Sequence, residues 1–119
     1  MEFFESLELH GRVVNVCTGD IGMVAAKKYD VEVWMPVQKT YREVVSCSNC
    51  TDYQTIGLNI KYAKGNERAY VHTLNSTCVA TTRALVAIME NFQDKKGVIH
   101  IPKALHKYCG FKKIGITKK

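Results

Sequence analysis

The residues of this sequence that could do chemistry together are concentrated between His72 and Arg83. The segment reads HTLNSTCVATTR and is typical of a strand that runs into a helix through polar residues. A strand end, a helix N-terminus and a guanidinium group in one place form a natural site for an anion such as a phosphate. Because an unpaired buried charge is very costly, Arg83 must either reach solvent or meet a negative partner. The pattern indicates an anion site, and an arginine that extends into water from a helix edge would give the same pattern.

A helix predicted over Cys78 to Phe92 should hold Arg83 close to a sheet. Ala80 and Ala87 precede and follow Arg83 by three and four residues, so they share its face of the helix. Such small residues let a helix lie near a sheet, which would hold the guanidinium group over the sheet surface. The apolar stripe that we expect to face the core consists of Leu85, Ile88, Met89 and Phe92.

Three polar residues precede this helix. Asn75, Ser76 and Thr77 are all good N-cap residues. If one of them caps the helix, the other side chains are free to face a ligand.

Glu43 and Ser46 are candidates for a nucleotide site on a strand predicted over Tyr41 to Ser48. Their spacing of three puts them on opposite faces of a regular strand, so both reach one ligand only near the strand end or at a bulge. A carboxylate that faces a nucleotide usually binds it through a divalent cation, because direct contact would repel the phosphates. The spacing alone favours a simpler role for Glu43, which is an ion pair with a neighbouring lysine or arginine.

Two further groups of residues could bind a metal. Asp30 and Glu32 share one face of the alternating strand DVEVWM, although such carboxylates are more often surface charges or partners of basic side chains. Cys47 and Cys50 form a CxxC pair, for which a zinc site would need a second pair of ligands and a redox site would need a parallel strand before a helix. Two packed thiols are the simplest interpretation of this pair.

The elements that must position these residues predict an α+β fold with an antiparallel sheet flanked by helices. Short links join consecutive strands, which favours antiparallel pairing. We expect strands over 12–17, 30–35, 41–48, 59–62, 69–75 and 98–101. We expect helices over 2–9, from the turn Thr18–Asp20 through Lys27, over 78–92, and from Pro102 through Tyr108.

Composition bounds the class of protein. The 119 residues and a hydrophobic content of 46% fit one domain or part of one. No apolar run approaches the ~20 residues that span a bilayer, so no membrane role is expected. The acidic start MEFFESLEL and five cysteines, an odd number, favour a reducing, cytoplasmic setting.

The net charge of +6 is concentrated at the C-terminal end. Acidic and basic residues cancel up to Lys96, and no acidic residue follows. Such a tail could contact a nucleic-acid backbone, and a solvated lysine-rich end is the more common case. The excess lysines are Lys103, Lys107, Lys112, Lys113, Lys118 and Lys119.

Four ordered motifs resemble the C-terminal part of the catalytic domain of the seryl-tRNA synthetase family. They are RVVNVCTGDIG, YDVEVWMP, YREVVSCSNCTDYQ and HTLNSTCVATTRALVAIMENFQ, and the later VIHIPKALHKYCGF is similar to the family's closing segment. The resemblance covers nearly the whole chain and implies a class II synthetase fold. It also implies activation of L-serine by ATP to seryl-adenylate, followed by transfer to tRNA(Ser), in a homodimeric complete enzyme.

The resemblance also implies roles for individual residues. Arg83 would be the motif 3 arginine, which contacts the γ-phosphate of ATP and is catalytic, within a motif 3 at about 72–92. Glu43 would hold Mg²⁺ through ATP, and Ser46 a ligand oxygen, with Val44 and Val45 completing the ATP segment. Asn75 and Thr77 would bind serine.

The sequence departs from the family in several respects. The resemblance starts after motif 2 of the family, so motifs 1 and 2 and the tRNA-binding arm are expected to be absent, and the 119 residues alone are expected to be inactive. The family usually has basic residues where this chain has Thr55-Ile56-Gly57. A stand-alone paralogue that binds a nucleotide or RNA, or an unrelated small zinc- or RNA-binding protein, remains an alternative at this point.

Overall fold

A computed structural model of the chain describes residues 1–115, which form two compact units. Unit 1 contains Met1–Val13, Val31–Val44 and the described residues from Val79 onward. Unit 2 contains Val14–Asp30 and Val45–Cys78. Lys118 and Lys119, two of the lysines in the basic tail, lie outside the described residues.

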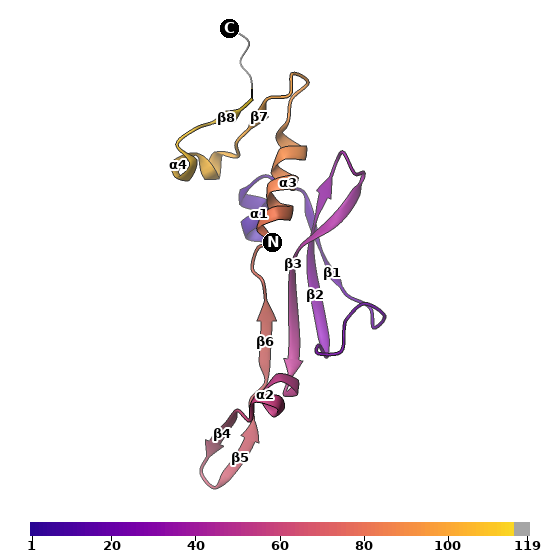
Figure 1. Cartoon of the computed structure of the whole chain (residues 1–119), viewed down its shortest axis with the longest axis vertical. Coiled ribbons are helices and arrows are strands. Elements are labelled where there is room, and N and C mark those ends of the chain that lie inside the picture. Colours follow the sequence, from indigo (N-terminus) through magenta and orange to yellow (C-terminus); the bar gives the residue numbers. More distant parts are fainter. Residues whose placement is uncertain (116–119) are drawn as a thin grey trace. The chain divides into compact units, whose positions relative to one another are not determined.

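A four-stranded sheet has the strand order β1-β2-β3-β6 (Figure 1). Its strands are β1 (Gly11–Asn15), β2 (Lys27–Met35), β3 (Thr40–Thr51) and β6 (Thr73–Ser76). Strands β3 and β6 are antiparallel, with Cys47 opposite Ser76 and Ser48 opposite Asn75. The predicted α+β class, an antiparallel sheet with helices, is confirmed, and the strands predicted at 30–35 and 41–48 are both longer than expected.

Unit 1 contains the longest helix and most of the buried core. Its other elements are short: α1 (Glu2–Ser6), β7 (Ile99–His100), η1 (Lys103–Leu105), α4 (His106–Cys109) and β8 (Lys113–Ile114), beside the long helix α3 (Thr81–Phe92). The buried apolar side chains of this unit come from α1 and the turn after it, from β2 and β3, and from α3. They are Phe4, Leu7, Leu9, Val33, Met35, Val44, Ala84 and Ala87.

The apolar stripe predicted on α3 is only partly buried. Ala84 and Ala87 are buried, whereas Leu85 and Met89 are 59% and 48% exposed. Ile88 and Phe92 are half-buried, so the predicted stripe is confirmed for two of its four residues and is wrong for Leu85 and Met89. A helix that lies close to a sheet buries its smallest residues. The burial of Ala87 agrees with the expectation that this residue lets the helix lie near the sheet.

Helix α3 also begins later than predicted. Its N-cap is Ala80, which makes no side-chain cap, and the Ala80 N–H donates to the carbonyl oxygen of Val44 at 2.8 Å. The strand β3 therefore holds the N-cap residue through its main chain, and no side chain caps the N–H groups of the first turn. None of the candidate cap residues Asn75, Ser76 and Thr77 caps the helix, and all three are exposed.

Unit 2 differs from the predictions in two elements. Residues 18–26 form turns and bends instead of a helix, because Gly19 and Gly22 (φ +80°) interrupt the segment and the Ala26 N–H bonds to Asn49 of β3 at 2.8 Å. A short helix that was not predicted, α2 (Tyr53–Leu58), follows β3 and ends at Asn59 in the left-handed conformation.

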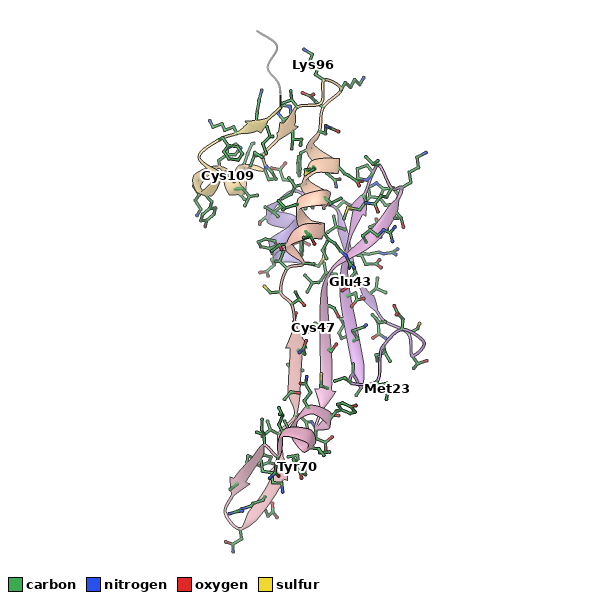
Figure 2. The ribbon with its side chains drawn as sticks, viewed as in Figure 1. Met23, Glu43, Cys47, Tyr70, Lys96 and Cys109 are labelled. Atoms are coloured by element: carbon green, nitrogen blue, oxygen red, sulfur yellow. The ribbon has the colours of Figure 1, made fainter. Side chains whose placement is uncertain are left out.

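The hairpin predicted around Lys64-Gly65-Asn66 is confirmed. It consists of β4 (Lys61–Lys64) and β5 (Glu67–Tyr70), which pair antiparallel. Gly65 has φ +62°, which a tight turn requires and glycine adopts without a steric penalty. The hairpin projects beyond α2, and both of its faces meet solvent over most of their length (Figures 1 and 2).

Candidate functional site

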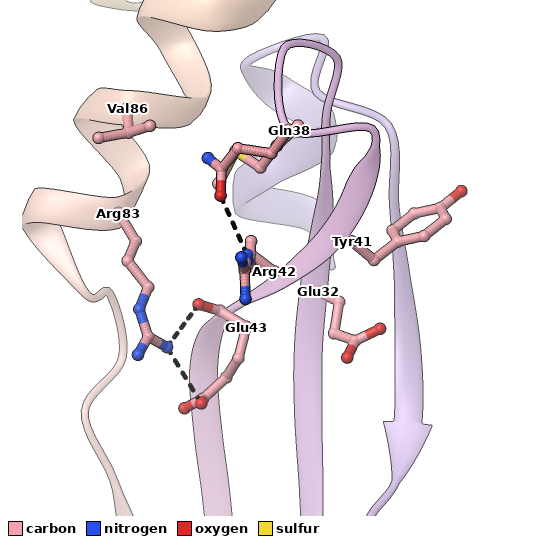
Figure 3. A pocket seen from close by; sticks show the side chains of 8 residues that line it. Glu32, Gln38, Tyr41, Arg42, Glu43, Arg83 and Val86 are labelled. Carbon is pink, nitrogen blue, oxygen red and sulfur yellow. Dashed lines mark hydrogen bonds and ion pairs between the residues drawn. The ribbon is translucent and has the colours of Figure 1, made fainter.

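Unit 1 contains a hollow of about 400 Å³ beside the first turns of α3 (Figure 3). Residues of β2 and β3, the turn between these strands, and α3 line it. They are Glu32, Met35, Gln38, Tyr41, Arg42, Glu43, Arg83 and Val86. Two arginines and two glutamates therefore meet in one place, and this charged group includes both Arg83 and Glu43 from the sequence prediction.

Arg83 is paired with Glu43 in this hollow. Its Nη1 donates to the main-chain oxygen of Glu43 at 2.9 Å and to the carboxylate Oε2 at 3.1 Å. The two side chains are 53% and 40% exposed. An ion pair this exposed contributes only about 0–1 kcal/mol of stability. The guanidinium group can therefore exchange the carboxylate for another anion at little cost, which is what an anion-binding residue requires.

The pairing settles two alternatives that the spacing left open. Arg83 meets a negative partner at the sheet instead of only extending into water, and the partner of Glu43 is an arginine, as the simpler interpretation favoured. Arg83 reaches the hollow because the buried Ala84 and Ala87 bring the first turn of α3 close to β3.

A second arginine is held in the hollow by a chain of hydrogen bonds. The Nε of Arg42 donates to Oε1 of Gln38 at 3.0 Å, and Nε2 of Gln38 donates to Oε1 of Glu90 at 2.8 Å. The other carboxylate oxygen of Glu90 accepts the Val37 N–H at 2.9 Å. The bond from Gln38 is the main cause that lowers the pKa of Glu90 below the ordinary value of a glutamate. Glu90 thus fixes the β2–β3 turn to α3, and Gln38 fixes Arg42 beside Glu43.

Glu32 is engaged by a third arginine. The Nε of Arg12 donates to Oε2 of Glu32 at 2.7 Å, and the Arg12 guanidinium carbon lies 4.2 Å from the centre of the Tyr41 ring. This agrees with the interpretation of Glu32 as the partner of a basic side chain. Asp30 lies in unit 2 and is buried.

Unit 2 contains a separate hollow of about 370 Å³ that holds Ser46 and Asn75. Ser48 and Asn75 are opposite each other on β3 and β6, and Ser46 is two residues from Ser48, so all three share a face of the sheet. The segment Ile21–Ala25 borders the hollow. Lys28 also lines the hollow, and its Nζ donates to the Asp20 carbonyl oxygen at 3.0 Å. Small neutral donors and acceptors in such a hollow suit a small polar ligand.

The remaining predicted residues lie in different surroundings. Val44 is buried in the core of unit 1, and Val45 is half-buried in unit 2. Thr77 is exposed just after the end of β6 and does not line the hollow that holds Asn75.

The CxxC pair is split between solvent and core. Cys47 is exposed, Cys50 is buried, and both are free thiols. Within residues 1–115, no three His, Cys, Asp or Glu side chains are grouped so that they could hold a metal. A metal beside Glu43 would therefore take its other ligands from a bound molecule or from water.

Comparison with known proteins identifies the family. The family model of the class II tRNA synthetase core domain (G, H, P, S and T) matches residues 1–92. This chain belongs to the class II tRNA synthetase core domain family. Crossing a lipid bilayer would need a longer and more apolar helix than any that this class II chain has in residues 1–115.

Serine–tRNA ligases are among the most similar curated relatives of this class II chain. The chain is 59% identical to the serine–tRNA ligase of Thermococcus sibiricus over 115 residues, which are 95% of the chain and 25% of the relative. The chain is 56% identical to the serine–tRNA ligase of Saccharolobus islandicus over 107 residues, which are 88% of the chain and 23% of the relative. The chain thus spans about a quarter of the length of the curated relatives that it matches.

Two solved structures resemble the chain over nearly its full length. The seryl-tRNA synthetase of Pyrococcus horikoshii complexed with ATP has a TM-score of 0.91 and 59% identity, and covers 95% of this chain and 26% of that one. The cytoplasmic serine–tRNA ligase of Naegleria fowleri in complex with AMP has a TM-score of 0.86 and 46% identity, with coverage of 98% and 28%. The resemblance to the seryl-tRNA synthetase family is thereby confirmed.

Sequence reasoning missed the network that holds the hollow together. Gln38 and Glu90 are 52 residues apart, and neither belongs to a recognisable motif. Arg42 carries a weak signal, since it is a second charge next to Glu43, but alternation along a strand argues against both residues facing one ligand. Only the packing of α3 against the β2–β3 turn reveals the connection.

Proposed function

We propose that this chain forms part of the active site of a serine–tRNA ligase. In this reaction an oxygen of the serine carboxylate attacks the α-phosphorus of ATP, pyrophosphate leaves, and seryl-adenylate forms. A terminal hydroxyl group of tRNA(Ser) then attacks the seryl carbonyl carbon, and AMP leaves. The observation that carries the proposal is the exposed Arg83–Glu43 pair in a hollow, within a chain 59% identical to a synthetase whose structure was determined with ATP.

Arg83 is proposed to bind the γ-phosphate of ATP. In the free protein its guanidinium group donates two hydrogen bonds to Glu43. Because that pair is exposed and weak, a triphosphate can replace the carboxylate as the acceptor. A guanidinium group forms charge-assisted bonds to phosphate oxygens, and it would stabilise the pyrophosphate as negative charge accumulates on it.

Glu43 is proposed to take part in binding Mg²⁺ together with ATP. The carboxylate would be released when Arg83 turns to phosphate, and carboxylate and phosphate oxygens are the ligands that Mg²⁺ prefers. A bound Mg²⁺ would neutralise phosphate charge and orient the triphosphate. The donor set fits this role, because residues 1–115 contain no group of three protein ligands, and Mg²⁺ that binds with a nucleotide commonly uses one or two carboxylates together with phosphate oxygens. Val44, Val45 and Ser46 would complete this ATP segment, with Ser46 bonding a ligand oxygen.

Asn75 and Thr77 are proposed to bind serine. The support for Asn75 is its position in the neutral hollow of unit 2, opposite Ser48. An amide side chain can donate to one polar group of the amino acid and accept from another. Thr77 would contribute its hydroxyl group from the end of β6.

The chain is proposed to be the C-terminal portion of the catalytic domain, with motif 3 at about 72–92. Motifs 1 and 2 and the tRNA-binding arm would belong to other parts of the complete enzyme, which we propose is a cytoplasmic homodimer. In-line attack on a triphosphate needs charge stabilised on several sides, and half of that arrangement is insufficient. The 119 residues by themselves are therefore expected to be inactive.

Serine-dependent exchange of pyrophosphate into ATP tests the proposal. The full-length protein should catalyse exchange with L-serine and not with L-threonine or L-alanine, and the isolated 119 residues should give none. A full-length protein that binds ATP but gives no exchange with any amino acid would favour the alternative, a paralogue that acts as a nucleotide- or RNA-binding module.

A further inference from the structure

The β4–β5 hairpin of unit 2 separates its charges onto one face. Paired residues of an antiparallel ladder share a face, and successive residues alternate. The register pairs Lys61 with Tyr70 and Ala63 with Arg68, so these four residues lie on one face of the hairpin. That face carries two cations and no carboxylate. We call it the basic face.

The opposite face has a different composition. Tyr62 pairs with Ala69, and Lys64 pairs with Glu67. A cation and a carboxylate directly opposite each other cancel in charge. The two faces of the hairpin therefore differ in net charge, although the order of its three cations and one carboxylate along the sequence does not reveal this.

The basic face also contains a hollow and an aromatic ring. A hollow of about 360 Å³ is lined by Lys61, Ala63 and Arg68 of this face, together with Asn59 and with Tyr62 of the opposite face. Ala63 keeps the space between Lys61 and Arg68 open because its side chain is a single methyl group. The Nζ of Lys61 lies 4.7 Å from the centre of the Tyr70 ring, which holds the ammonium group on this face. The amide of Asn59 adds a neutral hydrogen-bonding group beside the two cations.

The packing of the hairpin gives no structural reason for this arrangement. Every residue from Lys61 to Ala69 is exposed, so the cations do not cover a core. No acidic residue lines the hollow, and no ion pair that involves Lys61 or Arg68 is found among residues 1–115. Two unneutralised cations on an otherwise exposed ribbon are repelled by each other, and a polyanion would relieve that repulsion.

We propose that the basic face of the β4–β5 hairpin binds the phosphate backbone of the tRNA substrate. This inference rests on the proposed function, which supplies the polyanion. Arg68 would take a phosphate through its planar fork of donors and Lys61 through its ammonium group, with Asn59 bonding a sugar or phosphate oxygen. Contacts of this kind carry affinity and orientation without reading bases, so the hairpin would help to position tRNA and would not select it by sequence.

Binding of a fluorescently labelled tRNA(Ser) transcript to the full-length protein tests this inference without depending on catalysis. The pair of changes Lys61→Glu and Arg68→Glu should weaken binding about tenfold or more, and the log–log slope of affinity against salt should fall by about 0.7–0.9 for each lost phosphate contact. Lys64→Glu, the matched change on the opposite face, should alter affinity less than twofold. The neutral pair Lys61→Gln and Arg68→Gln should give an intermediate loss.

Two results would overturn the inference. One is equal affinity of the Lys61/Arg68 and Lys64 variants for tRNA. The other is binding of phosphatidylserine vesicles that depends on Lys61 and Arg68 while binding of tRNA does not. Failure of serine-dependent exchange by the unmodified protein would refute the proposed function instead, and the direct binding assay would still decide the role of the basic face.

Discussion

The hollows of the two units differ in how their polar side chains are held. In unit 1 every charged side chain that lines the hollow bonds to another side chain: Arg83 to Glu43, Arg42 to Gln38, and Glu32 to Arg12. In unit 2 the hollow is lined mostly by neutral groups such as Ser46, Ser48 and Asn75, which project from paired strands, and Lys28, which also lines it, bonds to a main-chain oxygen. Long flexible side chains need partners to stay in one position, whereas short side chains are oriented by the backbone itself.

This contrast suits ligands of different kinds. A hollow of mutually bonded ions can rearrange to accept a triphosphate, because each exposed ion pair costs little to break. A hollow of short neutral groups discriminates by size and hydrogen bonding, which suits an amino acid as small as serine. The two substrates of the proposed activation step, ATP and serine, thus place different demands on Arg83 and Glu43 of unit 1 and on Asn75 of unit 2.

The largest expected effect comes from the charged hollow. Arg83→Ala in the full-length protein should reduce kcat/KM for serine-dependent pyrophosphate exchange about 10²–10³-fold, since one charged contact to the transition state is lost. Arg83→Lys should restore only part of this loss because an ammonium group lacks the planar fork. Leu85→Ala, on the same helix and exposed, is the matched control and should leave exchange unchanged. Wild-type exchange by Arg83→Ala would remove Arg83 from the proposed mechanism.

The neutral hollow should respond with a smaller and more selective effect. Asn75→Ala should raise the KM for serine about tenfold, the value expected for about 1.4 kcal/mol of lost hydrogen bonding. The KM for ATP should change less than twofold, because Asn75 lines the hollow of unit 2 and does not line the hollow that contains Arg83 and Glu43. Steady-state exchange with each substrate varied in turn measures both values. Equal increases in the two KM values would contradict the division of labour between the hollows.

The smallest expected effect is a pH dependence confined to unit 1. The pKa of Glu90 is lowered, so the folded protein favours the carboxylate over the acid. The stability that Glu90 contributes is therefore complete above the ordinary glutamate pKa and is lost as the pH falls through the lowered pKa of the folded state. Glu90→Gln should flatten this part of the profile of unfolding free energy against pH, as measured by urea unfolding.

A second carboxylate of unit 1 should contribute to the same pH dependence of unfolding. Asp94 also has a lowered pKa, mainly because of its bond to His100, and it should behave in the same direction. A Glu90→Gln variant whose acid profile is identical to that of the parent protein would show that the Gln38–Glu90 bond does not couple α3 to the β2–β3 turn in solution.

The sequence predicted those parts of the fold that follow from local pattern. Alternation identified β2 and β3, and the glycine-containing turn identified the β4–β5 hairpin, because the period of two and the positive φ of Gly65 are local requirements. The helix predicted after Thr18 was wrong, and the apolar stripe predicted on α3 was wrong for Leu85 and Met89. Both depend on tertiary contacts, namely the bond of Ala26 to Asn49 and the close approach of Ala84 and Ala87.

The candidate site was predictable where a motif carried it and not beyond. The motifs contain Arg83, Glu43, Ser46 and Asn75. In the structure Arg83 bonds to Glu43 in the hollow of unit 1, and Ser46 and Asn75 line the hollow of unit 2. Gln38 and Glu90 carry no motif, since a hydrogen bond across 52 residues leaves no spacing to detect. Their roles follow only from three-dimensional packing.

The burial of two alanines on α3 has a consequence for inherited or engineered variation. Ala84 and Ala87 touch no proposed ligand, yet their methyl groups set how far the helix axis stands from the strands. A bulkier residue at either position would lift the whole first turn and carry the guanidinium of Arg83 out of reach. A screen for variants that lose nucleotide binding should therefore recover positions 84 and 87 together with position 83, although only the last bears a functional group.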